Sequence, residues 1–159
     1  MNQEYLKSKL HYNSGTGIFT WLKNGKVAGS VSHGYIKIMI DYKNHYAHRL
    51  AILYMTGGMP SDQTDHLNHD RADNRFSNLV EATNKSNGLN QSMKSNNTSG
   101  VTGVSKRNSG SWTARIMSNG IYKSLGTFKS KKDAIEARLL EELECGFHVN
   151  HGMSYGREK

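Results

Sequence analysis

The chain contains a single cysteine, Cys145, among its 159 residues. An internal disulfide framework and a cysteine-rich zinc site are therefore excluded, and a reducing compartment such as the cytoplasm is expected. No apolar run approaches the roughly 20 residues needed to span a bilayer. The first residues also lack the basic-then-apolar order of a signal peptide. We expect a soluble, cytoplasmic protein with no membrane partner.

Acidic side chains are scarce as well. The sequence has 13 Asp and Glu against 21 Lys and Arg, which gives a net charge of +8 with neutral histidines. A surplus of this size predicts a polyanion as partner. An anionic membrane is the competing partner, but no basic amphipathic helix with an apolar Trp/Phe/Leu face supports it. No feature of the sequence implies a protein partner.

The basic charge is concentrated in residues 94–132, which contain no acid. The next dozen residues hold five acids against one base. We therefore expect one polar binding face with a supporting helix behind it. Residues 92–100 are small and polar without hydrophobic periodicity, which predicts a linker between two domains.

Before this linker, short β-rich runs alternate with turn residues. We expect strands at 17–22 and 35–40 and a return strand beginning at His45. A helix is predicted from about 48 to 55 and ends at Gly57. Further along we expect a strand pair at 63–67 and 79–83, the enclosed loop 68–78, and a short helix at 84–91.

After the linker, three strands are predicted at 101–106, 111–117 and 121–127, with Asn119-Gly120 as a hairpin turn. Ser130 is a suitable N-cap for a helix that stops at Gly146. Its apolar residues repeat at i, i+4 and i+8, so one helix is expected to lie across the sheet. The residues of this stripe are Ile135, Leu139 and Leu143. The tail 147–159 shows no clear element.

The segment 65–75, followed by Asn78 and Asn87, carries most of the chemistry. The imidazole of His66 is a usable base at neutral pH, because the ordinary histidine pKa is ~6.5. The carboxylate of Asp65 is a hard oxygen ligand that suits Mg²⁺ or Mn²⁺. An asparagine amide oxygen further along can complete a sparse metal shell. One divalent metal beside one general base is a combination that hydrolyses phosphodiester bonds.

Residues 65–79 read Asp-His-Leu-Asn-His-Asp-Arg-Ala-Asp-Asn-Arg-Phe-Ser-Asn-Leu. This segment resembles HNH endonucleases in the variant whose third position is Asn, especially homing-type enzymes of phages and introns. The family pattern has Gly where this chain has His69. The resemblance implies a ββα-metal (His-Me finger) fold for residues 1–91, with an N-terminal β-rich extension and an overall α+β class. If the chain is phage-encoded, the host cytoplasm is its expected location.

The resemblance also implies individual roles. His66 would be the general base, and Asp65 and Asn87 would hold the metal. Asn78 would orient His66 by a hydrogen bond. Arg49 and Arg75 are expected to contact DNA, Arg49 from the start of a helix. His48 beside it has two interpretations, a group facing the site or a residue packed at the helix start.

Residues 101–146 resemble an AP2-type DNA-binding domain, through Val-Thr-Gly-Val-Ser, Trp-Thr-Ala-Arg-Ile and Leu-Gly-Thr-Phe. That fold lays a three-stranded sheet in the major groove of DNA. For Trp112, packing in the core is an equal alternative. The residues expected to face the groove are Lys106, Arg107, Trp112, Arg115 and Lys123.

These residues support three hypotheses for function. The first is a metal-dependent, site-specific endonuclease of double-stranded DNA that uses Mg²⁺, with Mn²⁺ as the alternative ion. The second is a non-catalytic DNA-binding regulator with a decayed nuclease domain. The third is an RNA-binding or RNA-cleaving protein, which a sheet inserted in a major groove disfavours because the major groove of RNA is narrow. One metal site per chain favours cutting one strand per binding event.

Overall fold

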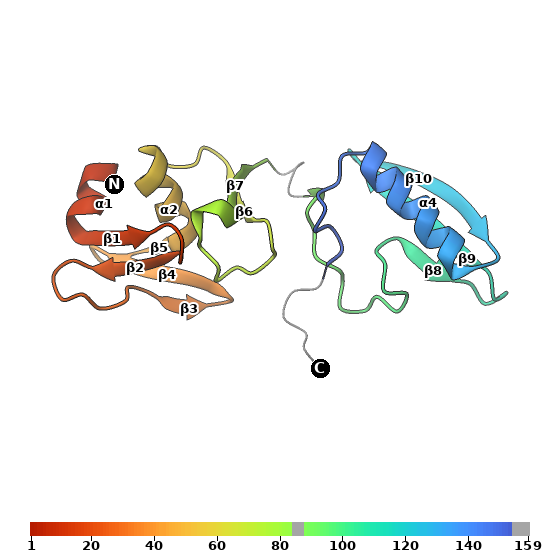
Figure 1. Ribbon diagram of the computed structural model, residues 1–159, viewed down its shortest axis with the longest axis horizontal. Helices are drawn as coiled ribbons and strands as arrows, with labels where there is room; N and C mark the ends of the chain where they lie inside the picture. The colour runs from red at the N-terminus through yellow and green to blue at the C-terminus, as the bar shows by residue number, and fades with distance from the viewer. Residues whose placement is uncertain (84–87, 154–159) are drawn as a thin grey trace. The chain divides into compact units, whose positions relative to one another are not determined.

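The computed structural model describes residues 1–83 and 88–153, and the chain divides into two compact units, Met1–Asn84 and Lys85–Lys159. Both units combine helices with antiparallel strands (Figure 1), which confirms the predicted α+β class. The predicted domain boundaries at 91 and 101 stay predictions. Residues 84–87, which include part of the helix expected at 84–91, lie outside the described residues. Among the described residues, no helix is long and apolar enough to cross a membrane.

The first unit contains three small antiparallel sheets: β1 with β2, β3 with β4 and β5, and β6 with β7. The strands and helices expected at 17–22, 35–40, 48–55, 63–67 and 79–83 are all present. The elements are α1 Gln3–Lys9, β1 Leu10–Asn13, β2 Ile18–Trp21, β3 Ser30–Ser32, β4 Tyr35–Ile40, β5 Lys43–Tyr46, α2 Ala47–Thr56, β6 Gln63–His66, the 3₁₀ turn η1 Phe76–Asn78 and β7 Leu79–Ala82.

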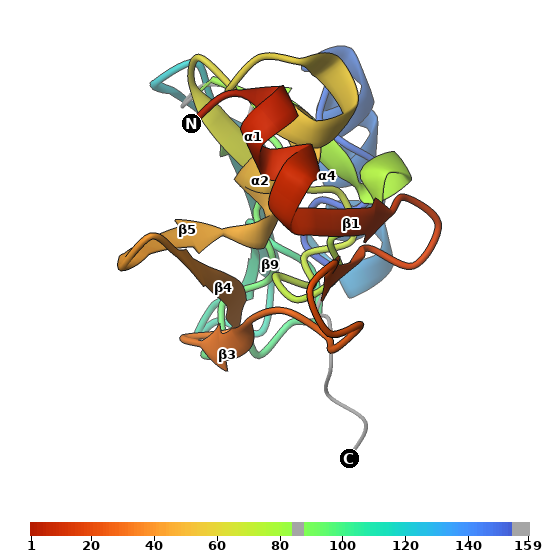
Figure 2. The same cartoon turned by 90° about the vertical axis from the view of Figure 1, so that its left-hand side faces the viewer.

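The core of this unit forms where α1 and α2 pack beside each other and over the strands (Figure 2). Leu50 and Leu53 of α2 are almost fully buried, as the i, i+3 spacing predicts. The helix begins directly after β5 and ends at Gly57, whose φ of 84° makes it a left-handed C-cap. Since no loop separates β5 from α2, the first turn of α2 is held at the end of the β3–β4–β5 sheet.

The turn between β1 and β2 packs against the loop that follows β6. The hydroxyl of Tyr12 donates to the carbonyl of Asn74 at 2.6 Å, and the N–H of Phe76 donates to the carbonyl of Ser14 at 3.0 Å. Gly17 lies at this contact with a φ of 75°, and a Cβ there would be 2.5 Å from the backbone nitrogen of Arg75. The close approach of two backbones therefore requires glycine at this position.

The second unit is a three-stranded antiparallel sheet in the order β10-β9-β8, with α4 packed on one face (Figure 1). This confirms the predicted sheet with one helix across it. Ser130 caps the helix as expected, its hydroxyl accepting from the N–H of Asp133 at 3.1 Å. The elements are β8 Val104–Lys106, β9 Trp112–Ser118, β10 Ile121–Phe128 and α4 Lys131–Glu144.

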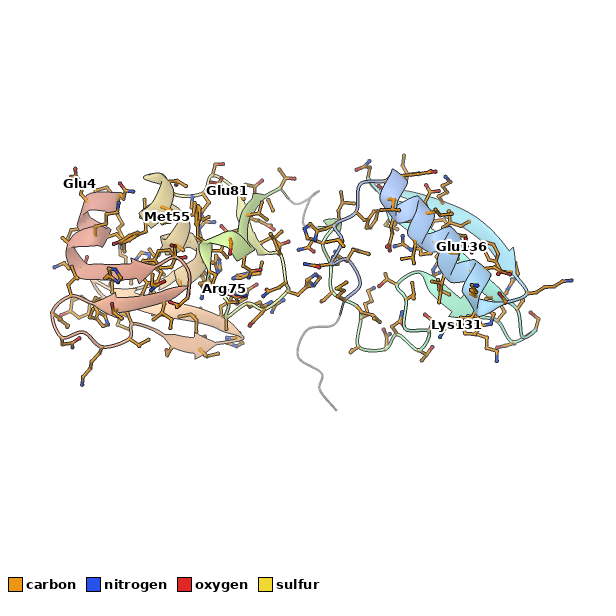
Figure 3. All side chains as sticks on the ribbon, in the orientation of Figure 1. Glu4, Met55, Arg75, Glu81, Lys131 and Glu136 are labelled. Atoms are coloured by element: carbon orange, nitrogen blue, oxygen red, sulfur yellow. The ribbon has the colours of Figure 1, made fainter. Side chains whose placement is uncertain are left out.

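The face that α4 turns to the sheet is not centred on the predicted apolar stripe. Ala134 and Arg138 are buried, whereas Leu139 and Leu143 are 48% and 77% exposed. The small Ala134 lets the helix approach β8 and β9. The guanidinium of Arg138 is neutralised by Glu142 at 2.9 Å and donates to the carbonyl of Thr102 at 3.0 Å. Paired in this way, an arginine occupies the interior while leucines lie outside. Figure 3 shows Lys131 and Glu136 projecting from this helix.

Backbone hydrogen bonds tie residues 89–93 to residues 148–153 within the second unit. The N–H of His148 donates to Leu89 at 3.1 Å, and the N–H of Gly152 donates to Gln91 at 2.8 Å. The part of the expected tail that the structure describes is thus attached, although it forms no helix or strand.

Replacing Gly17 by alanine should destabilise the first unit by about 2–4 kcal/mol, because the new methyl group meets fixed backbone and the left-handed φ is strained. Gly25→Ala is the matched control: Gly25 has a φ of 68° but nothing within 4 Å of the position of a Cβ. Urea unfolding monitored by fluorescence measures both variants. Equal losses would show that the contact with Asn74 and Arg75 contributes nothing.

Candidate active site

The candidate site lies at the end of β6, in the hairpin that β6 forms with β7. His66 pairs with Leu79 and Asp65 with Val80 across the two strands. His66 is 3% exposed and Asp65 is partly buried. Neighbouring side chains of a strand point to opposite faces, but Asp65 Oδ1 turns back to accept the N–H of His66 at 2.9 Å. This bend keeps the carboxylate beside the residue that carries the imidazole.

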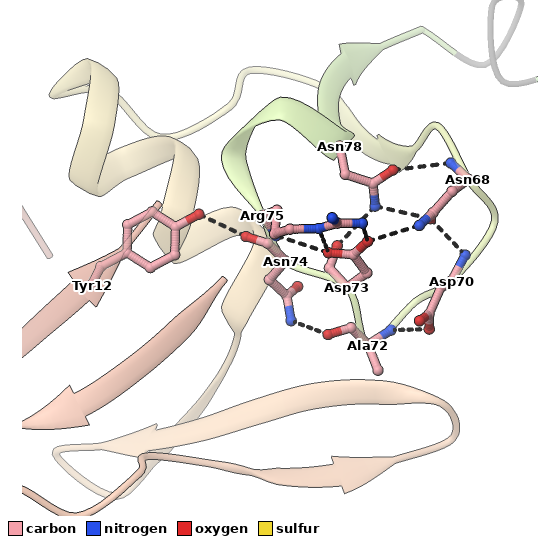
Figure 4. A network of polar contacts seen from close by, with 8 residues as sticks. All are labelled: Tyr12, Asn68, Asp70, Ala72, Asp73, Asn74, Arg75 and Asn78. Carbon is pink, nitrogen blue, oxygen red and sulfur yellow. Dashed lines mark hydrogen bonds and ion pairs between the residues drawn. The ribbon is translucent and has the colours of Figure 1, made fainter. Parts of the chain in front are cut away.

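Two paired amide side chains close the loop between β6 and β7 (Figure 4). Asn78 Oδ1 accepts the N–H of Asn68 at 3.0 Å, and Asn78 Nδ2 donates to Asn68 Oδ1 at 2.9 Å. Asn78 Nδ2 also donates to the carbonyl of Asp73 at 2.9 Å, and Asn68 Nδ2 to the Asp73 carboxylate at 2.7 Å. The side chain of Asn78 therefore bonds to the loop, and its expected role in orienting His66 stays a prediction.

Asn74 is the amide that raises the pKa of His66. It is 2% exposed, it is held by its own Nδ2 donating to the carbonyl of Ala72 at 2.9 Å, and its side chain favours the protonated imidazole. Burial nevertheless lowers the pKa of His66 below its ordinary value, against the opposing effects of Asn74 and the nearby carboxylates. His66 is thus neutral at pH 7, as a general base must be. The sequence offered no signal for Asn74, since asparagine in a loop ordinarily indicates a turn.

Aromatic rings pack around His66. The ring of His48, from the first turn of α2, lies 5.0 Å from the ring of His66 at 87°, an edge-to-face contact. Tyr35 of β4 lies 5.4 Å from His48 and 6.1 Å from His66, and Tyr46 stacks on His48 at 5.2 Å. His48 is 6% exposed and packs at the start of α2, and its facing the site stays a prediction.

His48 is also neutral. Burial, with His66 and Arg49 as further causes, lowers its pKa to about 3. Its Nδ1 is buried and has no hydrogen-bond partner among residues 1–83 and 88–153. Two uncharged imidazoles can therefore lie in contact without repulsion.

The arginines expected to contact DNA in this unit are engaged with the protein. Arg49 donates to the carbonyls of Asp62 and Pro60, each at 2.8 Å, and so fixes the loop after α2. Arg75 forms a two-pronged ion pair with Asp73, which lowers the pKa of that carboxyl. Arg71, which the sequence did not single out, is exposed and lies over the ring of Tyr35 at 5.0 Å.

His69, the departure from the family pattern, occupies a position of positive φ, 65°. Glycine adopts this left-handed conformation freely, which explains the family preference, whereas a residue with a side chain does so at a cost of roughly 1–2 kcal/mol. The turn is kept here, with the N–H of His69 donating to the carbonyl of His66 at 3.0 Å.

The donor set can be tested against a divalent metal. No group of three or more His, Cys, Asp or Glu side chains that could hold an ion occurs among the described residues. This excludes a closed zinc site there, since such a site needs four protein ligands. One carboxylate beside a base suits Mg²⁺, which keeps several waters and takes one or two carboxylates together with substrate phosphate. The predicted second ligand, Asn87, lies outside the described residues.

In the second unit, strand register separates the residues expected to face DNA. Residues directly opposite each other share a face of the sheet. Lys123 is opposite the buried Ile116, and its Nζ bonds to Glu141 of α4 at 2.7 and 2.9 Å, so it lies on the helix side. Arg115 alternates with the buried Ala114 and Ile116 and lies on the open face.

Two more of these residues share the helix side. Trp112 packs against the core and has Lys106 and Lys131 over its ring at 6.0 and 5.6 Å. Lys106 is directly opposite Trp112 in the register. Lys106, Trp112 and Lys123 therefore lie on the helix side of the sheet, and their expected contact with DNA stays a prediction. Arg107 lies in the turn after β8 and is exposed.

Acid should weaken the first unit through His48. Between about pH 3 and 6.5 the unfolded chain binds a proton at this residue that the folded chain does not. Stability rises with pH where the unfolded state binds more protons. The contribution of His48 to the free energy of unfolding should therefore be fully present above pH 6.5. It should be lost as the pH falls below that value, by at most ~1.4 kcal/mol per pH unit. Urea unfolding at pH 7, 6 and 5 measures this slope. His48→Phe should reduce this slope, leaving the contribution of His66, whose pKa is also lowered. His11→Phe, at an exposed position, should leave the slope unchanged, and equal slopes in all three proteins would contradict the assignment.

The central segment of the chain matches a known protein family. Residues 45–89 match the model of a family described as HNH endonuclease. The matched segment includes α2, β6, the loop and β7, and so contains His48, Asp65, His66 and Asn78. No curated protein matches this chain.

Among solved structures, the chain is similar to one that describes DNA binding and cleavage by the HNH homing endonuclease I-HmuI, with 23% identity and a TM-score of 0.47. The similar region covers 57% of this chain and 56% of that one, so the chain spans just over half the length of that structure. The AP2-type likeness of residues 101–146 stays a prediction. The expected enzyme class, a phosphodiester-cleaving HNH endonuclease, is confirmed by the family match. Residues 45–89 of the chain are therefore similar to HNH endonucleases.

Proposed function

We propose that this protein is a metal-dependent, site-specific endonuclease of double-stranded DNA. The observation that carries the proposal is the buried, neutral imidazole of His66 beside the carboxylate of Asp65, at the end of β6. A base next to a hard oxygen ligand can activate water against a phosphodiester, and the net charge of +8 favours a polyanionic substrate.

Each proposed role depends on the position of the residue. His66 accepts the proton of the attacking water. Asp65 and Asn87 would hold one Mg²⁺, or Mn²⁺ in its place. When bound, the ion would reduce the charge on the phosphate and assist the departing oxygen. Asn78 and Asn68 keep the loop closed, so that Asn74 stays against His66.

Arg71 is the arginine of this unit that we assign to the phosphate of the substrate. Its guanidinium is exposed and held over Tyr35, whose ring also neighbours His66. Arg49 and Arg75 use their donors on backbone carbonyls and on Asp73 instead. A guanidinium presents a fork of donors that matches phosphate oxygens.

His66→Ala and Asp65→Ala should each reduce cleavage of supercoiled plasmid about 10²–10⁴-fold, the usual contribution of a general base, with a similar loss expected for the metal ligand. EDTA should abolish cleavage by the wild type, and Mg²⁺ should restore it. His11→Ala, an exposed histidine on β1, is the matched control and should cut normally. Full activity of either site variant would contradict the proposed roles. Tight DNA binding without cleavage by the wild type would favour the non-catalytic regulator.

We further propose that DNA sequence is recognised on the open face of the β10-β9-β8 sheet. Besides Arg115, this face carries residues that alternate with the buried positions or lie opposite them. Arginine suits the bidentate contact to guanine, and hydroxyls bond to bases or phosphates. The other residues of the open face are Ser105, Thr113, Met117, Tyr122 and Ser124.

Arg115→Ala should weaken binding to the preferred DNA site by about 1–3 kcal/mol and relax specificity at one position. Lys123→Ala is the matched comparison, since Lys123 lies on the neighbouring strand but is bonded to Glu141. It should change specificity little. Sequencing of the sites cut in a random DNA pool, with binding measured at fixed salt, tests both. A loss of specificity in Lys123→Ala but not in Arg115→Ala would place recognition on the opposite face.

A further inference from the structure

We propose that His48 is a positioning residue, which holds the ring plane of the general base His66 by an edge-to-face contact. The inference rests on the proposed role of His66. His48 lies within the segment 45–89 that matches the family model, but outside the 65–79 motif. Its proposed role depends on the contact between two rings and not on the metal.

The first support is the geometry of the contact. The two rings lie 5.0 Å apart at 87°, within the range in which aromatic rings attract each other edge to face. His66 belongs to the end of a short, two-stranded sheet, which by itself restrains a side chain weakly. A ring set at right angles against it limits rotation about the Cβ–Cγ bond of His66.

The second support is the rigidity of His48. It lies in the first turn of α2, it stacks on Tyr46 at 5.2 Å and 18°, and it meets Tyr35 at 5.4 Å. Since α2 carries the buried Leu50 and Leu53, the backbone of His48 is fixed by the core of the unit. The ring of His48 therefore links the core of the unit to the base at the end of β6.

The third support is that the contact between the two rings is described by their packing and does not involve a hydrogen bond of His48 Nδ1. His48 Nδ1 has no hydrogen-bond partner among the described residues. A flat ring without a nitrogen should therefore replace His48, whereas a residue of similar bulk without a ring should not.

The test compares three variants of the full chain in cleavage of a DNA duplex. His48→Leu keeps an apolar side chain of similar size, and together with His48→Ala it should lower kcat about 10–100-fold, the scale of loss that a displaced catalytic group causes. KM and DNA affinity should stay within about 2-fold of the wild-type values, because the residues proposed to contact DNA are unchanged. His48→Phe should keep kcat within about 3-fold of the wild type, since its ring retains the contact. Normal turnover in His48→Leu, or a loss in His48→Phe as large as that in His48→Leu, would overturn the proposal.

A second measurement does not depend on nuclease activity. The Cε1–Hε1 signal of His66 in ¹H–¹³C spectra, assigned by its disappearance in His66→Ala, should be sharp in the wild type and in His48→Phe. It should broaden or shift toward its value in a mobile side chain in His48→Leu. An unchanged signal in His48→Leu would refute positioning even if the enzyme cuts DNA. A wild type that shows the expected spectra but cleaves no DNA would refute the proposed function alone.

Discussion

The paired amides of Asn68 and Asn78 are the interaction on which the candidate site depends. They close the loop between β6 and β7 with two hydrogen bonds, and Asp73 joins them from the middle of the loop. Two strands of four residues do not form a stable sheet alone. The closed loop, braced from the other side by Tyr12 and the β1–β2 turn, gives the end of β6 a fixed geometry that the strands by themselves could not provide.

Burial of two histidines is the second constraint, and it acts on charge as well as on shape. Removing His66 and His48 from water disfavours their protonated forms, and the pKa of each is lowered. For His66 this fits the proposed role, because a general base must begin without its proton. For His48 it permits contact with a second imidazole. The acidic loop around His66 opposes the effect of burial without reversing it, so carboxylates can lie near the base while it remains neutral.

The second unit shows how a helix can be placed by one buried charge and a small residue. Arg138 bonds to Thr102 and pairs with Glu142, and Ala134 allows close approach to the sheet. The leucines that dominate the sequence pattern of α4 lie outside. The same arrangement draws Lys123 toward the helix through Glu141 and leaves Arg115 on the open face. Strand register, and not charge alone, thus selects the residues that lie on the open face of the sheet.

Local features of the sequence were sufficient to predict most elements. The alternation at 35–40, the spacing of Leu50 and Leu53, and the Ser130 cap all depend on neighbouring residues, and each prediction was confirmed. α1 was not predicted, and neither were β1 and β3, because short elements with mixed composition carry a weak pattern. Asp65 and His66 were identified by adjacency and motif, since their chemistry is evident from residue type.

Only the tertiary structure decided which side chains meet. Several contacts join segments that local pattern cannot relate. They are the contact of His48 with His66, the placement of Asn74 against His66, and the bonds of Arg49 and Arg75 to other residues of the unit. Tertiary structure also decided which side of α4 packs on the sheet, because burial of Arg138 depends on the carbonyl of Thr102 in another segment. The sequence by itself determined the chemistry that is present. The folded chain determined its orientation, because a side chain acquires a defined partner only when distant backbone is fixed around it.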